Sequence, residues 1–218
     1  MEDISDVHLQ PLTKSKFLDP KCLHYKQNGV QKKLECILEH TDVSILLFNT
    51  TRNVFVFVKQ FRPAVYLQNS KIEMVEGQEL INTKKYPAHL GMTIELCAGI
   101  VDKDMPLIQV AQAEVLEECG YDVPEEQLQR VTSFRNGTSS SGSLVNLYYA
   151  EVTDSMRVNQ GGGLASEGEL IQVIEMPVSE VQSLISSEHI NREPGLMFAV
   201  LWFLSNIWPQ RYKAIKEK

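Results

Sequence analysis

Three glutamates stand close together near the middle of the chain, in the stretch AEVLEECGY at residues 113–121. The run before them, PLIQVAQ, places its apolar residues on one face of a predicted helix: Leu107, Val110 and Ala111. With 3.6 residues per turn, Glu114, Glu117 and Glu118 continue that face. Carboxylates so close repel one another and are costly to bury, so they need cations. Oxygen ligands favour Mg²⁺ or Mn²⁺, which clamp phosphate oxygens and activate water for attack on phosphorus. The alternative is a solvated face that keeps the helix soluble.

The elements around this helix predict how the site is built. The strand MTIELCAG (92–99) ends in glycine shortly before the helix, which we expect over about 107–119. Gly120 then stands where a left-handed residue ends a helix. Residues 44–63 predict a β-hairpin that ends at a proline. Arg62, at its end, can grip phosphate or carboxylate, although such arginines are more often surface ion-pair partners.

The remaining pattern predicts a mixed-sheet α/β sandwich after an N-terminal β segment at about residues 7–50. Residues 66–91 resemble a long polar insertion, and residues 160–169 a Gly-rich acidic loop. Three more strands and two helices are expected, the first helix capped by Ser179 and the second buried on all sides because it is apolar nearly all round. The strands are expected at 130–134, 143–153 and 170–177, and the helices at 178–186 and 193–208.

Composition limits the class of protein. The 218 residues are 43% hydrophobic and 22% charged, as in globular proteins, and the net charge of −7 without a basic cluster argues against a duplex nucleic-acid partner. No apolar run approaches the roughly 20 residues of a membrane span, and no signal peptide is recognisable. Four widely spaced cysteines are expected as reduced, mostly buried thiols. The sequence therefore predicts a soluble cytoplasmic protein without a membrane partner.

The stretch GIVDKDMPLIQVAQAEVLEECGY (99–121) resembles the Nudix signature. The matching positions are Gly99, Glu114, Val115, Glu117, Glu118, Gly120 and Tyr121. Two positions depart, because Met105 stands where the signature has its first Glu and Ala113 stands where it has Arg. In the family that Glu and Arg support the motif and do not bind metal, so the metal ligands are expected to be present. The two departures leave weakened catalysis as an alternative.

Flanking segments resemble the ADP-ribose and UDP-sugar pyrophosphatase branch of the family, at residues 58–66, 94–102 and 161–173. Residues 23–32 and 195–205 look most like the animal UDP-glucose pyrophosphatases. The resemblance implies a Nudix α/β/α sandwich over residues 43–218, with a mixed β-sheet. It also implies that an N-terminal antiparallel β segment, residues 1–42, serves dimerisation, so that the protein is a homodimer.

The same resemblance implies roles for individual residues. The carbonyl of Ala98 and the carboxylates of Glu114 and Glu118 would bind Mg²⁺, or Mn²⁺ in its place, with Glu117 as ligand or base. Glu167 or Glu169 falls where this branch carries a mobile catalytic carboxylate. Substrate contacts are expected from four further residues: Gln60, Arg62, Gly99 and Arg135.

The function implied is Mg²⁺-dependent hydrolysis of the pyrophosphate bond of UDP-glucose to glucose 1-phosphate and UMP, with ADP-ribose as a second substrate. One alternative is an ADP-ribose pyrophosphatase. Another is a catalytically weak Nudix-fold protein that binds nucleotide sugars, which the residues at Met105 and Ala113 keep open.

Overall fold

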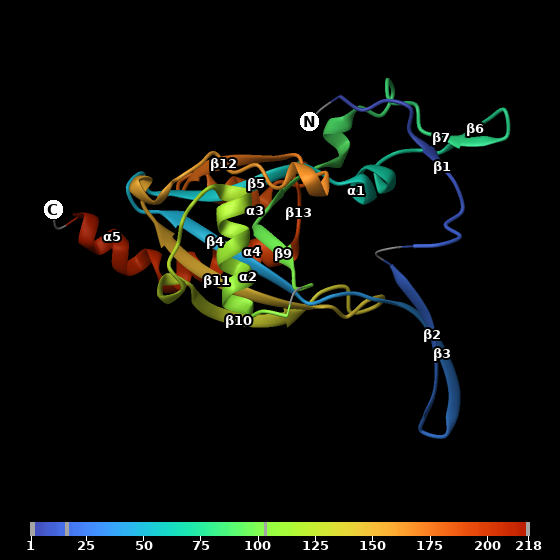
Figure 1. The fold of residues 1–218 in the computed structure, drawn as a ribbon, viewed down its shortest axis with the longest axis horizontal. Coiled ribbons are helices and arrows are strands. Elements are labelled where there is room, and N and C mark those ends of the chain that lie inside the picture. Colours follow the sequence, from blue (N-terminus) through green and yellow to red (C-terminus); the bar gives the residue numbers. More distant parts are fainter. Residues whose placement is uncertain (1–2, 16–17, 103, 217–218) are drawn as a thin grey trace.

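The computed structural model describes residues 3–15, 18–102 and 104–216. Within these ranges the body is one mixed sheet of eight strands with helices on both faces (Figure 1). The strand order is β10-β11-β4-β5-β8-β13, with β12 added on β5 and β9 on β4. The strands are β4 (Asp42–Asn49), β5 (Val54–Phe61), β8 (Met92–Glu95), β9 (Cys97–Ile100), β10 (Gln129–Arg135), β11 (Leu144–Val152), β12 (Ile171–Pro177) and β13 (Asn191–Arg192). The pairs β11–β4 and β13–β8 are parallel and the others antiparallel, so the predicted mixed sheet is confirmed.

Strand β4 shows why the sheet is covered on both faces. Val43, Ile45 and Leu47 pack with helix α2 (Leu107–Glu114), while Leu46 and Phe48 pack with the opposite helices. All five side chains are fully buried, as expected when helices cover both faces of a sheet. The helices on the second face are α3 (Val181–Ser186), α4 (Pro194–Asn206) and α5 (Trp208–Lys216). The fold is therefore the predicted α/β/α sandwich.

Two expectations about the helices are wrong. Helix α3 begins at Val181 after a turn in which the Glu180 amide donates to the Pro177 carbonyl, and its N-cap makes no side-chain hydrogen bond, so Ser179 does not cap it. Helix α4 begins with Pro194 as expected, but it is not buried on all sides, because Phe198 and Leu201 are almost half exposed.

The predicted insertion at 66–91 is a connection with short elements of its own. It contains the end of α1 (Pro63–Gln68), the small strands β6 (Glu73–Val75) and β7 (Gln78–Leu80), and a 3₁₀ turn, Ala88–Gly91. Strand β7 pairs with β1 (His8–Leu9), so the N-terminus and the insertion form a separate three-stranded sheet.

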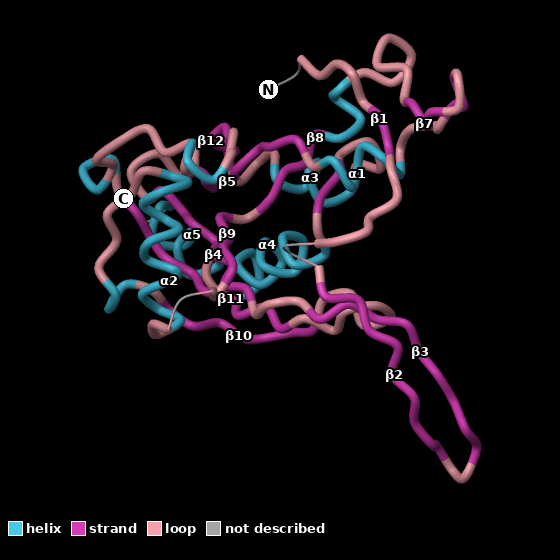
Figure 2. The backbone as a smooth tube through the Cα atoms, turned by 45° about the vertical axis from the view of Figure 1, so that its right-hand side comes forward, coloured by secondary structure: helices cyan, strands magenta, loops and turns pink. Residues whose placement is uncertain are grey.

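The N-terminal segment otherwise forms a two-stranded hairpin that projects from the body (Figures 1 and 2). It consists of β2 (Asp19–Gln27) and β3 (Val30–Leu38), joined at Asn28 and Gly29, which both have positive φ angles. Near its base the Ile37 amide donates to the Ser140 carbonyl, 2.9 Å away. One face of the hairpin carries exposed apolar side chains: Leu23, Tyr25, Val30, Leu34 and Leu38. The other face is mostly polar and includes His24, Lys26, Gln31, Lys33 and Glu35.

Among the described residues, none of the helices is both long enough and apolar enough to cross a membrane. The four cysteines are unpaired, as expected. Cys97 and Cys119 are buried, whereas Cys22 is exposed on the hairpin and Cys36 is half-buried there, so the expected burial holds for only two of the thiols.

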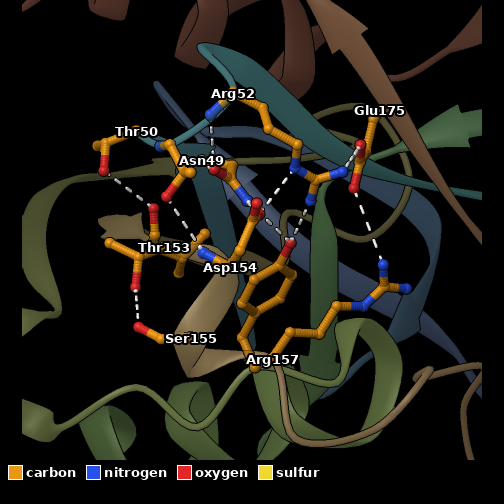
Figure 3. Close-up of polar contacts among 11 residues, drawn as sticks. Asn49, Thr50, Arg52, Thr153, Asp154, Ser155, Arg157 and Glu175 are labelled. Carbon is orange, nitrogen blue, oxygen red and sulfur yellow. Dashed lines mark hydrogen bonds and ion pairs between the residues drawn. The ribbon is translucent and has the colours of Figure 1, made fainter.

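A polar cluster holds the sheet together just beyond the acidic helix (Figure 3). The hydroxyl of Tyr121, which is fully buried, accepts hydrogen bonds from Asn49 and Arg52, each 3.3 Å long. The Arg52 guanidinium also binds the carboxylates of Asp154 and Glu175. The last position of the signature is thus fixed to the β4–β5 turn and to β12.

Candidate active site

A cavity of about 300 Å³ opens where β9 lies beside the C-terminal end of α2. Its lining contains eight of the ten site residues predicted from the sequence. The lining residues are His40, Gln60, Arg62, Ala98, Gly99, Ile100, Asp102, Glu114, Glu117, Glu118 and Glu169. The spacing of the three glutamates therefore predicted a real concave site rather than a solvated helix face.

The helix changes its geometry at the acidic residues. After Glu114 the chain continues as a π-helical turn, Val115–Cys119, which Gly120 ends with a φ of 77°. We expected an α-helix through Cys119; π turns add one residue to a helical turn and are frequent at functional sites. Within this turn Glu118 is 3% exposed, while Glu117 is half-buried.

Glu118 is the carboxylate with the strongest need for a cation. Its Oε2 accepts a hydrogen bond from the Ala98 amide at 2.9 Å. Burial is the largest of the effects that raise the pKa of Glu118 to about 8. The nearby carboxylates of Glu114 and Glu169 contribute to the rise, and the hydrogen bond from Ala98 opposes it. A bound cation would offset both effects, because it favours the charged form of the carboxyl group.

Gly99 makes room for the second carboxylate. A Cβ atom at this position would lie 2.0 Å from both Cδ and Oε1 of Glu114, so a side chain larger than hydrogen would displace the glutamate. The oxygen donors that line the cavity suit Mg²⁺ or Mn²⁺. Among the described residues, no three acidic, His or Cys side chains are gathered closely enough to hold a metal ion as they stand.

The Gly-rich loop is bound directly to the acidic turn. The amides of Gly162 and Gly163 donate to the carbonyl oxygens of Glu118 and Glu117 at 2.9 and 3.1 Å. A Cβ on Gly161 would lie 2.2 Å from the Glu118 carbonyl, and its φ is 68°, so glycine is required there twice over.

This loop carries the two candidate catalytic carboxylates. Glu169 lines the cavity, and its Oε2 accepts a hydrogen bond from the Leu164 amide at 2.8 Å. Glu167 lies in a short 3₁₀ turn, Ala165–Glu167, and its side chain is outside the described part of the structure.

Arg62 is held by a glutamate that the sequence did not single out. Its Nε and Nη2 donate to Oε1 and Oε2 of Glu95 at 2.9 and 2.6 Å. Gln60 and Thr93 also donate to this carboxylate, at 3.0 and 2.6 Å. Burial alone would raise the pKa of Glu95, which is 4% exposed, but the hydrogen bonds and charge of Arg62 lower it below its usual value. Arg62 is thus an ion-pair partner, as one interpretation of the sequence expected, and it also lines the cavity. Its contact with substrate stays a prediction.

Arg135 is the predicted site residue that the structure leaves away from this cavity. It ends β10, and its Nη1 donates to the Gly142 carbonyl at 3.0 Å. The next residue, Asn136, instead lines a second cavity of about 250 Å³ that shares Arg62 and the Ala98–Ile100 wall with the first.

The two departures from the signature have apolar surroundings. Met105 is partly buried and packs against the hydrophobic core beneath α2. Ala113 is half-buried on the same helix. The charged pair of the signature is therefore replaced by packing at Met105 and by a small side chain at Ala113.

No family model matches the sequence. Full-length relatives nevertheless exist: the chain is 39% identical over 219 residues to "Uridine diphosphate glucose pyrophosphatase NUDT14" of Bos taurus and, equally, of Mus musculus, covering 96% of this chain and 98% of each relative. It is also 30% identical over 167 residues to a GDP-mannose pyrophosphatase of Salmonella typhimurium, covering 76% of this chain and 75% of that protein.

Among solved structures, the chain is similar to an ADP compounds hydrolase with a TM-score of 0.60 at 11% identity. The likeness covers 93% of this chain and 92% of the other. At this identity the comparison shows a shared fold.

Proposed function

Since the chain belongs to the Nudix hydrolases, among the relatives of the UDP-glucose pyrophosphatases, we propose that it hydrolyses the pyrophosphate bond of UDP-glucose to glucose 1-phosphate and UMP. The observation that carries this proposal is the cavity in which Glu114, Glu117 and Glu118 face the β9 backbone. Identity over nearly the whole chain to two UDP-glucose pyrophosphatases supports the choice of substrate.

Mg²⁺ is the proposed cofactor, with Mn²⁺ as a substitute. Glu114 and Glu118 would hold it together with the carbonyl of Ala98, and Glu117 would assist. When bound, such a metal neutralises phosphate oxygens and lowers the pKa of water. The raised pKa of Glu118 and the space left by Gly99 support this assignment, because each is relieved or used by a cation beside the carboxylates.

The remaining side chains would bind substrate and move the proton. Arg62, fixed in direction by Glu95, would grip the pyrophosphate while Gln60 supports the same carboxylate. Glu169 or Glu167 on the Gly-rich loop, or Glu117 on the helix, would accept the proton of the attacking water. Gly99 would let the substrate approach the β9 backbone, and Arg135 would act only at the edge of the site.

ADP-ribose is the proposed second substrate, and an ADP-ribose pyrophosphatase is the alternative enzyme. The fold shared with an ADP compounds hydrolase is compatible with both proposals. A catalytically weak nucleotide-sugar binding protein is the alternative outside enzymes, because Met105 and Ala113 replace the supporting Glu and Arg.

We also propose a cytoplasmic homodimer joined through the N-terminal segment, residues 1–42, with residues 43–218 as the hydrolase domain. An isolated two-stranded hairpin is at best marginally stable, and this one exposes an apolar face that includes Leu23 and Leu34. A second copy of the chain would cover that face.

One hydrolysis screen tests the proposal. UDP-glucose, UDP-galactose, ADP-ribose, GDP-mannose and diadenosine polyphosphates are each incubated with Mg²⁺ and with EDTA, and the products are separated by anion exchange. We expect the highest kcat/KM for UDP-glucose, the products glucose 1-phosphate and UMP, and no turnover in EDTA. Turnover highest for ADP-ribose would favour the alternative enzyme, and binding without metal-dependent turnover would favour the binding protein.

A further inference from the structure

The second cavity lies on the side of the sheet that faces helix α4. It is lined by the start of β4, by Asn136 and Val145, and by Glu193, the residue that precedes α4. Arg62 and the Ala98–Ile100 wall separate it from the cavity that contains the acidic turn. A group joined to the pyrophosphate can therefore extend past Arg62 into this space.

Three polar side chains that line the second cavity, Asp42, Ser44 and Glu193, make no side-chain hydrogen bond among the described residues. The Ser44 side chain is 6% exposed and lines the cavity, yet among the described residues no hydrogen bond is made by its hydroxyl. The carboxylates of Asp42 and Glu193 make none either within the described ranges. Asn136 uses its Oδ1 to accept from the Gly137 amide, which leaves its NH₂ group to donate. Of these side chains Ser44 is buried, Asp42 is half-buried, and Asn136 and Glu193 are exposed. Ser44 and Asp42 therefore favour a polar ligand most, because hydrogen-bonding groups withdrawn from solvent are normally paired.

The charges decide what kind of ligand fits. The guanidinium of Arg62 is already paired with Glu95. Asp42 and Glu193 form no ion pair among the described residues, although His40 lies near Asp42 and Arg62 near Glu193. Loss of hydration raises the pKa of both carboxyl groups, and so do the neighbouring acids Glu39 for Asp42 and Glu95 for Glu193. The charges of His40 and Arg62 lower the two pKa values only in part. The carboxylates of Asp42 and Glu193 disfavour a phosphate here. A metal ion would leave the hydrogen-bond donors of Ser44 and Asn136 without an acceptor. Neutral hydroxyl groups suit all of them, because they donate to the carboxylates and accept from the donors.

We propose that this second cavity binds the sugar of the nucleotide sugar, and that Asp42, Ser44 and Glu193 select a hydroxylated ring. The inference rests on the proposed function, in that it assigns one half of that substrate. The volume of about 250 Å³ is below the roughly 300–1,000 Å³ of pockets for drug-sized ligands, which fits one ring rather than a nucleoside.

The test compares two substrates that share the phosphoanhydride and the uridine. One is UDP-glucose and the other is the β-methyl ester of UDP, which carries methyl in place of glucose. For Asp42→Asn and Ser44→Ala we expect kcat/KM on UDP-glucose to fall about tenfold, chiefly through KM. The first replaces a charged acceptor of sugar hydroxyl groups by a neutral amide, and the second removes a hydroxyl that would bind the sugar. On the methyl ester both variants should stay within about twofold of wild type, and Glu180→Gln, which removes an exposed carboxylate elsewhere, should change neither substrate.

Other outcomes would overturn the inference. Equal losses on both substrates would mean that the side chains only position Arg62, and no loss on either would mean that the cavity is unused. ADP-glucose separates sugar from base: a loss on UDP-glucose that is absent on ADP-glucose would place the base in this cavity.

Calorimetry on the metal-free protein measures binding of the same ligands to the same variants. It compares the affinities for UDP-glucose and the methyl ester in the absence of turnover. A protein that binds UDP-glucose through Asp42 and Ser44 but does not cleave it would disprove the proposed function and retain the cavity assignment. If the wild type cleaves UDP-glucose but Asp42→Asn binds it with normal affinity, the proposed function is retained and the cavity assignment is disproved.

Discussion

Arg62 and Glu95 meet through two parallel hydrogen bonds, Nε to Oε1 and Nη2 to Oε2, at the boundary of the two cavities. The Glu95 carboxylate is buried, while the Arg62 guanidinium remains about half exposed. Such a pair fixes the direction of an arginine, so its remaining donors are aimed before a ligand arrives.

Glu95→Gln should therefore weaken substrate binding without touching the acidic turn. Gln keeps the size of the side chain but loses the charge that holds Arg62, and we expect KM for UDP-glucose to rise about tenfold with kcat changed much less. Steady-state kinetics measures both constants. Thr93→Ser, which keeps a hydroxyl beside Glu95, is the matched control and should behave as wild type; a fall in kcat with unchanged KM would contradict the positioning role.

Glu118→Gln should reduce kcat by on the order of 10³, because it removes the charge of a proposed metal ligand while the shape is kept. The fold should persist, as judged by circular dichroism and thermal unfolding. Glu126→Gln, at an exposed position of the 3₁₀ turn after the helix, is the control. Turnover of UDP-glucose within a few-fold of wild type would show that the acidic turn is not the metal site.

The pKa of Glu118 also predicts a pH dependence of stability without metal. The folded-state pKa of about 8 exceeds the ordinary glutamate pKa of 4.5, so between these pH values the native state binds more protons than the unfolded state. The free energy of unfolding should then fall as pH rises through this window, by a few kcal/mol in all. Glu118→Gln removes the effect and should be more stable than wild type at pH 8 but equal to it near pH 4.

Urea unfolding in EDTA at a series of pH values measures this difference, and Mg²⁺ should restore the stability of the wild type alone at pH 8. A constant difference between the two proteins at all pH values would show that ionisation of Glu118 is not its cause.

Restoring the charged pair of the signature should be a coupled change. Met105→Glu alone exchanges core packing for a partly buried carboxylate and should lower the melting temperature, and Ala113→Arg alone adds a cation whose signature partner is absent. Together they should recover part of each loss in activity and stability. A double-mutant cycle measures the coupling, and strict additivity of the two effects would disprove it.

The apolar face of the hairpin should hold the dimer together. Leu23 and Leu34 are register partners and about half exposed, so changing both to Ser should give a monomer near 24.7 kDa, while wild type scatters light as a dimer. Lys26→Ser with Gln31→Ser, a register pair on the opposite face, should leave the dimer intact. A wild-type monomer at micromolar concentration with full activity would exclude the homodimer.

The features that the sequence predicted well depend on neighbours in the chain. Glu114, Glu117 and Glu118 follow from helical spacing, and the β4–β5 hairpin follows from alternation and a turn. The π turn carries no sequence signal of its own, because a helix can take up one extra residue without a change in composition. A helix that is apolar all round likewise does not reveal which face remains uncovered, as Phe198 shows.

The residues missed lie far apart in sequence. Glu95 serves Arg62 only because β5 and β8 pair in a register that sets Val58 against Glu95. The second cavity joins residues from β4, the β10–β11 connection and the start of α4, which only the tertiary structure brings together. The sequence did offer one signal for this pair, because Glu95 is a carboxylate in an otherwise largely apolar predicted strand. Its partner Arg62 could not be deduced from spacing along the chain.

The amides of Gly162 and Gly163 donate hydrogen bonds to the carbonyl oxygens of Glu118 and Glu117 in the acidic turn. If substrate displaces the Glu169 loop, we expect the displacement to be transmitted through these bonds to the turn, and so to the proposed metal ligands. Thermodynamic linkage makes this relation reciprocal: by whatever factor the ion tightens the hold on substrate, substrate tightens the hold on the ion. We therefore expect metal and nucleotide to bind cooperatively, with these two peptide hydrogen bonds as one link between their sites.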